Sequence, residues 1–60
     1  MRYFYLPDED VVVRLDENTG SMWVFQNGDW VENYEYGVIF TGDEPYKEIT
    51  RDQVPMYTVR

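Results

Sequence analysis

The sequence predicts an all-β fold, a small twisted antiparallel meander of four to five strands in a single domain spanning residues 1–60. Three short apolar runs, Val11–Leu15, Met22–Phe25 and Trp30–Val31, are separated only by turn-forming residues. Asn27 and Gly28 join the last two runs, and this dipeptide suits a two-residue type I′ turn because both positions need a positive φ. A chain of this length allows one domain with a small core.

Each apolar run accounts for one expected strand. Residues 3–6 form the first, which Pro7 and the acidic residues after it end. Val11–Leu15 forms the second, because stiff β-branched side chains suit a pleated sheet better than a helix. Met22–Gln26 and residues 29–33 form a hairpin. Residues 38–40 are a fifth short apolar run, and residues 56–59 are a candidate closing strand.

One short helical turn is expected near residues 50–54. Thr50 and Gln53 match a capping box, in which each side chain satisfies a free backbone N–H at the start of a helix. Pro55 follows closely, and proline is poorly tolerated inside a helix. We therefore expect the helix to end after about one turn, as a 3₁₀ or single α turn.

The lengths of the two turns predict the strand register. A two-residue loop at residues 27–28 and a four-residue loop at residues 17–20 each place specific residues directly opposite one another. The predicted pairs are Gln26 with Asp29, Phe25 with Trp30, Val24 with Val31, Trp23 with Glu32, Leu15 with Met22, Val13 with Val24, and Val12 with Phe25. A slip of one residue would exchange the two faces of the sheet.

This register separates an aliphatic face from an aromatic face. The aliphatic face contains Val11, Val13, Leu15, Met22, Val24 and Val31. The aromatic face contains Val12, Arg14, Trp23, Phe25, Trp30 and Glu32. The aliphatic face is a core, and the aromatic face must be covered either by residues 34–60 or by another molecule. The hydrophobic residues that would provide the internal cover are Tyr34, Tyr36, Ile39, Phe40, Ile49, Val54 and Met56.

Composition excludes several kinds of chemistry. The chain has no Cys and no His, which removes disulfides, thiolate catalysis, imidazole bases and ordinary zinc sites. No catalytic, cofactor-binding or metal-ligating motif stands out, and we expect no enzyme and no cofactor. Residues 16–20 share features with the start of a calcium loop, but the glycine comes one residue early and the twelfth-position Glu is missing. They are interpreted as a polar hairpin loop.

The charge balance narrows the possible partners. Twelve acidic residues against five basic ones give a net charge of −7. Direct binding to nucleic acid or to an anionic membrane needs clustered Lys and Arg, so neither is expected. No apolar run approaches the roughly 20 residues that span a bilayer, the N-terminal segment does not match a signal peptide, and no small-molecule site is evident. A cytoplasmic protein is expected.

Two resemblances add to this interpretation. Residues 54–59 resemble the proline–tyrosine–valine ending of SH3 domains, which implies an SH3-like barrel as the alternative fold if residues 56–59 pair with the first strand. The wider pattern of Trp23, the hairpin at residues 27–30 and the turn at residues 48–50 is similar to small uncharacterised acidic β proteins of bacteria and phages. That second resemblance implies a bacterial or phage protein but no particular activity.

Two hypotheses for function follow. The first is a small non-enzymatic interaction module that forms a homodimer or docks another protein through its aromatic face, since Trp, Tyr and Arg dominate interface hot spots. Its candidate interaction residues are Arg14, Trp23, Phe25, Trp30, Tyr34 and Tyr36. The alternative is an acidic nucleic-acid mimic that inhibits a basic partner protein. It requires one continuous row of carboxylates from Asp8, Glu9, Asp10, Asp16, Glu17, Asp43 and Glu44.

Overall fold

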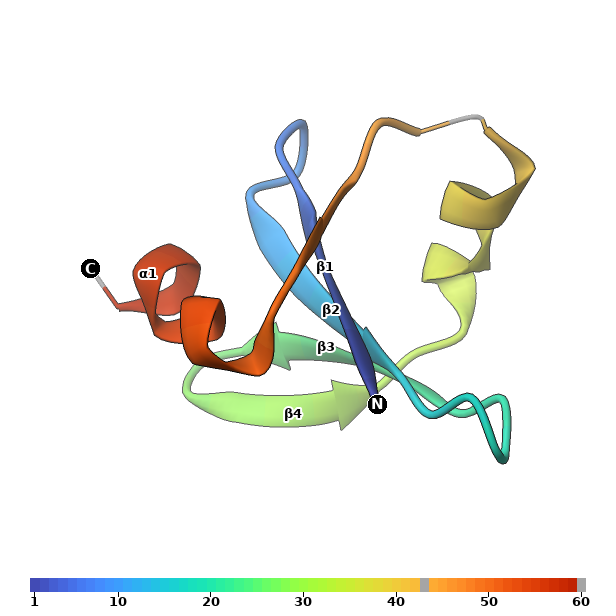
Figure 1. Ribbon diagram of the computed structural model, residues 1–60, viewed down its shortest axis with the longest axis horizontal. Coiled ribbons are helices and arrows are strands. Elements are labelled where there is room, and N and C mark those ends of the chain that lie inside the picture. The colour runs from blue at the N-terminus through green and yellow to red at the C-terminus, as the bar shows by residue number, and fades with distance from the viewer. Residues whose placement is uncertain (43, 60) are drawn as a thin grey trace.

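The computed structural model describes residues 1–42 and 44–59 as an open five-stranded antiparallel sheet with short helical segments on it (Figure 1). The strands are β1 (Arg2–Leu6), β2 (Val11–Leu15), β3 (Met22–Gln26), β4 (Asp29–Glu32) and β5 (Lys47–Ile49). The helical segments are the 3₁₀ helices η1 (Glu35–Thr41) and η2 (Arg51–Gln53) and the helix α1 (Val54–Thr58). The strand order is β4-β3-β2-β1-β5, so the first four strands form a meander and β5 adds to its other edge. The predicted fold class is confirmed.

The register of the meander follows the turn chemistry. All four predicted pairs between β3 and β4 are present, and Leu15 with Met22 and Val13 with Val24 pair β2 with β3. The turn between β3 and β4 has φ of 53° at Asn27 and 85° at Gly28, the positive values that a type I′ turn needs. The ladder between β2 and β3 ends at Val13, so the pair predicted between Val12 and Phe25 lies beyond it.

Both faces of the sheet carry buried side chains. One cluster consists of Phe4, Leu6, Val13, Met22 and Val24, with Tyr36 of η1 packed against it. The other consists of Val12, Ile49 and Val54, with aromatic side chains of β1, β3, β4 and α1 around it. The adjacent residues Val12 and Val13 are 1% and 0% exposed, although they point to opposite faces. The sheet therefore has buried apolar side chains on both of its faces.

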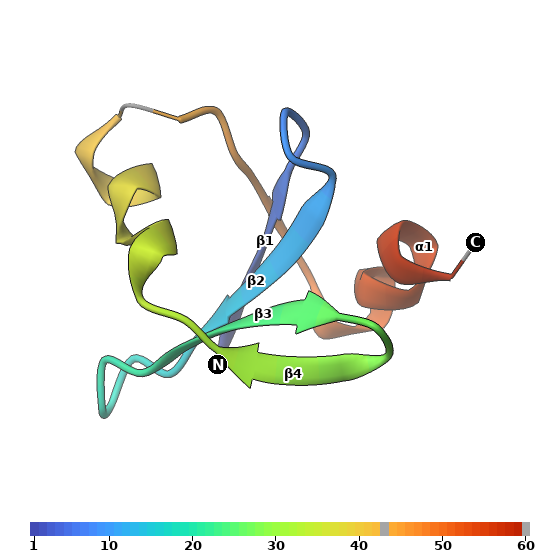
Figure 2. The same cartoon turned by 180° about the vertical axis from the view of Figure 1, so that it is seen from behind.

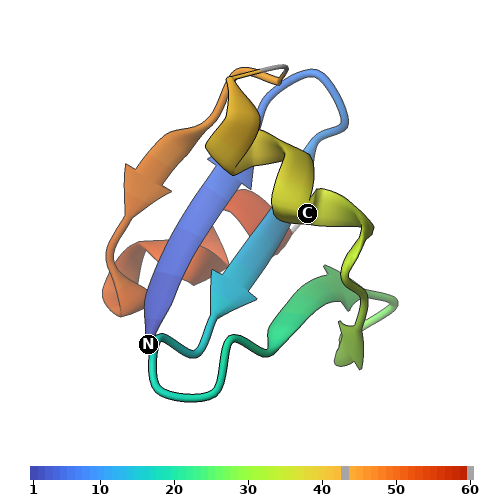
Figure 3. The same cartoon turned by 90° about the vertical axis from the view of Figure 1, so that its right-hand side faces the viewer.

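Helical segments provide this cover from opposite sides. Figures 1 and 2 show α1 on one side of β1 and β2 and η1 on the other, and Figure 3 shows η1 in front of these strands. α1 packs against β2, and its Val54 joins the cluster around Val12. The segment after residue 33 thus divides between the two faces instead of folding only over the aromatic one.

Three local predictions are wrong. Residues 38–40 lie in η1 and not in a strand, because a short apolar run does not by itself distinguish a strand from a helical segment. Residues 56–58 lie in α1 and do not form the closing strand, so the alternative SH3-like barrel is not the fold of the described residues. Pro55 does not end the helix but stands in the first turn of α1, where its missing N–H costs no hydrogen bond.

The strand that does extend the sheet beyond β1 is β5. Tyr3 pairs with Ile49, and Arg2 holds Glu48 through two hydrogen bonds of 2.8 and 3.0 Å. Two of the three residues in β5 are charged, which suits an edge strand, and β5 therefore contains no apolar run that would predict a strand. The capping box at the following turn is present, since the backbone N–H of Thr50 donates to Gln53 Oε1 at 2.9 Å.

Candidate protein-interaction surface

The structure stacks an arginine against two tryptophans on the aromatic face. Arg14 on β2 lies directly opposite Trp23 on β3, and its guanidinium carbon is 4.6 Å from the centre of the Trp23 ring. The same carbon is 4.7 Å from the centre of the Trp30 ring on β4. Both distances are within cation–π range. We call Arg14, Trp23, Phe25 and Trp30 the aromatic surface; all four side chains are half-buried.

Ring contacts hold this surface in place. Phe25 meets Trp30 edge to face with ring centres 5.2 Å apart, and Tyr3 on β1 lies 6.2 Å from Trp30 in a tilted arrangement. Both separations are typical of favourable aromatic pairs. Arg14 Nε is buried and has no hydrogen-bond partner. The arginine is thus held by ring stacking on a rigid sheet, with one buried donor unsatisfied.

α1 covers only part of the aromatic face. Val54 packs on Val12, and Tyr57 stacks on Tyr5 with ring centres 4.4 Å apart. Tyr3, Tyr5 and Tyr57 lie on this face as well, although they are not among the predicted interaction residues. The alternation of Tyr3 and Tyr5 with Phe4 in β1 carries the signal for the first two, since alternate residues share a face.

The structure does not bring the two predicted tyrosines to this surface. Tyr36 packs on the opposite face, against the cluster that contains Phe4 and Val13. Tyr34 precedes η1 and is 59% exposed. Of the predicted interaction residues, Arg14, Trp23, Phe25 and Trp30 are together.

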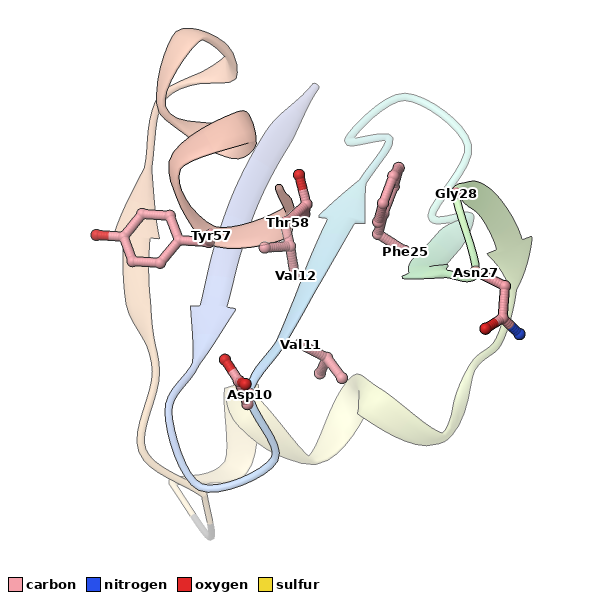
Figure 4. A pocket seen from close by; sticks show the side chains of 8 residues that line it. All are labelled: Asp10, Val11, Val12, Phe25, Asn27, Gly28, Tyr57 and Thr58. Atoms are coloured by element: carbon pink, nitrogen blue, oxygen red, sulfur yellow. The ribbon is translucent and has the colours of Figure 1, made fainter. Parts of the chain in front are cut away.

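A small hollow lies between the end of α1 and the turn that joins β3 to β4 (Figure 4). Its lining residues are Asp10, Val11, Val12, Phe25, Asn27, Gly28, Tyr57 and Thr58. Its volume of about 240 Å³ is below the range of roughly 300–1,000 Å³ that small-molecule pockets occupy. The Thr58 hydroxyl donates to the carbonyl of Val54 at 3.0 Å, and Tyr5 donates to Asp10 Oδ1 at 2.8 Å.

The carboxylates of the nucleic-acid-mimic hypothesis fall into two groups. Residues 8–10 form the turn between β1 and β2, and Glu44 lies beside them because its side chain hydrogen-bonds Glu9. Asp16 and Glu17 follow the other end of β2, which is about 16 Å long at the usual strand rise. Asp43 lies outside the described residues. This arrangement is not one continuous row.

Two side chains near the larger acidic group have raised pKa values. The pKa of the Glu44 carboxyl is raised, first by the hydrogen bond with Glu9 and then by desolvation and the charges of Glu9 and Asp8. The pKa of Tyr36 is raised mainly by desolvation, and the charges of Glu9, Glu44 and Glu35 add to this effect. Both groups therefore feel the negative charge of the turn between β1 and β2.

Within residues 1–42 and 44–59, no group of three or more carboxylates is arranged to hold a metal ion. None of the helices in the described parts of the chain is long and apolar enough to cross a membrane. Comparison with protein-family models, with curated proteins and with solved structures gives no match.

Proposed function

We propose that this protein is a small non-enzymatic interaction module that binds protein, either a second copy of itself or another chain, through its aromatic surface. The observation that carries the proposal is the stack of Arg14 against Trp23 and Trp30, whose side chains are only half-buried although α1 covers the neighbouring Val12. Trp and Arg are the residue types most enriched in interface hot spots.

The geometry of the stack favours recognition over a purely internal role. Of the guanidinium nitrogens of Arg14, Nε alone is buried without a hydrogen-bond partner. Within the described residues Arg14 forms no ion pair, although the chain is strongly acidic. A partner group that accepts a hydrogen bond from the guanidinium would use a cation that the fold already holds in place.

Preorganisation lowers the entropic cost of binding. The rings sit on paired strands and contact one another, so few side-chain rotamers remain to be ordered when a partner arrives. Removal of one hot-spot side chain typically costs about 2 kcal/mol, or roughly thirtyfold in Kd. We expect a loss of this size when Trp23 is replaced by Ala.

Site-specific photo-crosslinking tests the proposal. A photoreactive phenylalanine derivative, which keeps an aromatic ring at the substituted position, replaces Trp23 in one chain and Tyr46 in a control chain. Tyr46 is an exposed aromatic residue that contacts Phe4, which belongs to the opposite face. After irradiation in the source cells we expect one dominant adduct from position 23, with its yield lowered at least about fivefold by Arg14→Met.

Sedimentation of the purified chain at micromolar concentration identifies the kind of partner. If the chain is a dimer and Trp23→Ala dissociates it, the aromatic surface binds a second copy. If the chain is a monomer, the crosslinked partner is another protein. Equal adduct yields from positions 23 and 46, with no dimer, would overturn the proposal.

A further inference from the structure

The outer edge of β4 is an open strand beside the aromatic surface. β4 is the last strand of the sheet, and none of the strands in the described chain pairs with its outer side. In Figure 1 it runs along the rim of the sheet below β3. An exposed sheet edge offers a row of backbone donors and acceptors to which an extended peptide adds as a further strand.

The hydrogen-bond pattern identifies which groups this edge offers. The N–H of Asn33 donates to the carbonyl of Met22 at 3.0 Å, so Asn33 faces β3. Residues of an antiparallel strand alternate between bonding one neighbour and the other. Val31 and Asp29 therefore also face β3, and the N–H and C=O of Trp30 and Glu32 point outward.

The side chains of β4 give this edge a chemical preference. Its sequence is Asp29, Trp30, Val31 and Glu32, so two carboxylates enclose two large apolar residues. Val31 is 43% exposed, and both acidic residues are exposed. Cross-strand pairs of opposite charge and of apolar groups each stabilise a sheet, whereas like charges oppose pairing. The complementary strand has the pattern basic–apolar–apolar–basic.

Charge argues against a second copy as the occupant. Two chains joined edge to edge would bring four carboxylates onto adjoining strands and would add one net charge of −7 to another. A basic segment would experience attraction from the same field. The acidic residues of β4 thus discourage self-pairing while they select a partner of opposite charge.

We propose that β4 binds an extended basic segment of a partner protein as an added antiparallel strand. Its Lys or Arg residues face Asp29 and Glu32, and its apolar residues face Trp30 and Val31. The proposal rests on the proposed protein-binding function, because Trp30 belongs to the aromatic surface and an added strand would extend that surface.

Amide hydrogen exchange with a defined peptide tests this inference. The probe is a capped Thr-Lys-Val-Val-Lys-Thr peptide, and the matched control peptide carries Glu in place of Lys. In the free chain the amides of Trp30 and Glu32 should exchange quickly and that of Val31 slowly. The basic peptide should slow exchange at Trp30 and Glu32 at least about tenfold, and the acidic peptide should not. The double substitution Asp29→Lys, Glu32→Lys should weaken binding roughly tenfold, and Asp52→Lys in η2 should leave it nearly unchanged.

Three outcomes would overturn the inference. Equal protection by both peptides would remove the charge preference. Failure of the basic peptide to protect Trp30 and Glu32 would remove the added strand. Protection that grows with protein concentration without peptide would make a second copy the occupant. In each of these cases, a photo-crosslinked adduct from position 23 would still support the aromatic surface as the binding site. Only the proposal of an added strand on β4 would then be wrong.

Discussion

The two buried faces of β2 allow a direct test of whether α1 remains docked on the sheet. Val12 and Val13 are adjacent and almost completely buried, Val12 under α1 and Val13 in the cluster with Phe4 and Val24. We expect Val12→Ala and Val13→Ala to destabilise the fold to a similar extent. Val31→Ala serves as the matched control, because Val31 is 43% exposed on an edge strand.

The expected magnitude follows from the atoms that are lost. Each core substitution removes two buried carbon groups at about 0.8 kcal/mol each, and the cavity left behind brings the total to about 2–3 kcal/mol. The control should cost less than about 0.5 kcal/mol. A chain of 60 residues has a free energy of unfolding of about 3–9 kcal/mol. The core substitutions should therefore lower Tm by about 8–24 °C.

Urea denaturation followed by tryptophan fluorescence measures these differences, since Trp23 and Trp30 lie in the sheet. The slope with denaturant should be the same for all variants, so that the midpoint alone reports the change. If Val12→Ala costs no more than Val31→Ala while Val13→Ala shows its full cost, α1 does not cover the sheet and the two-sided core is wrong.

Further substitutions test individual interactions. Gly28→Ala should cost about 1–2 kcal/mol, because φ is +85° there and no atom lies within 4 Å of an added methyl group; thermal unfolding measures it. Gln53→Ala removes the side chain that accepts from Thr50 N and should cost about 1 kcal/mol in the same assay. The hydrogen bond from Arg2 lowers the pKa of Glu48, so its stabilising contribution is present above the unfolded-state pKa of about 4.3 and is lost as the pH falls through the native value. Glu48→Gln should thus lower Tm at pH 7 and have no effect at low pH. Glu44 has a raised pKa in the native state. Its contribution to stability is therefore fully present below the unfolded-state pKa of about 4.3 and is lost as the pH rises through the native pKa. Glu44→Gln should therefore raise Tm only at pH values above the native pKa of Glu44. A rise in Tm at low pH instead would contradict the raised pKa.

Local turn chemistry was sufficient to predict the meander. The dipeptide at residues 27–28 fixes the pairing of β3 with β4, and that pairing sets which side chains share a face. The stack of Arg14 with Trp23 and Trp30 follows from the same register. These features depend only on residues close together in the chain.

Features that depend on distant contacts were not predictable in this way. The backbone of Lys47 and Glu48 forms a strand because the edge of β1 is available, and neither side chain signals it. Tyr36 is of a residue type common in interfaces, but it lies in η1 and packs on the opposite face of the sheet. The run at residues 56–59 has strand propensity, yet Pro55 favours the first turn of a helix once η2 has started one.

The pairing of β1 with β5 also has a consequence for folding kinetics. Arg2 and Glu48 are 46 residues apart, whereas each hairpin of the meander closes across one short turn. Closing a long loop costs more conformational entropy, so β5 should join the sheet after the four-stranded meander has formed. The same segment should open first, and η2 and α1 should leave with it because they follow β5 directly. Brief opening of this unit would uncover Val12 and the rings beside it while the meander stays intact. The aromatic face would then be the part of the core most often exposed to solvent.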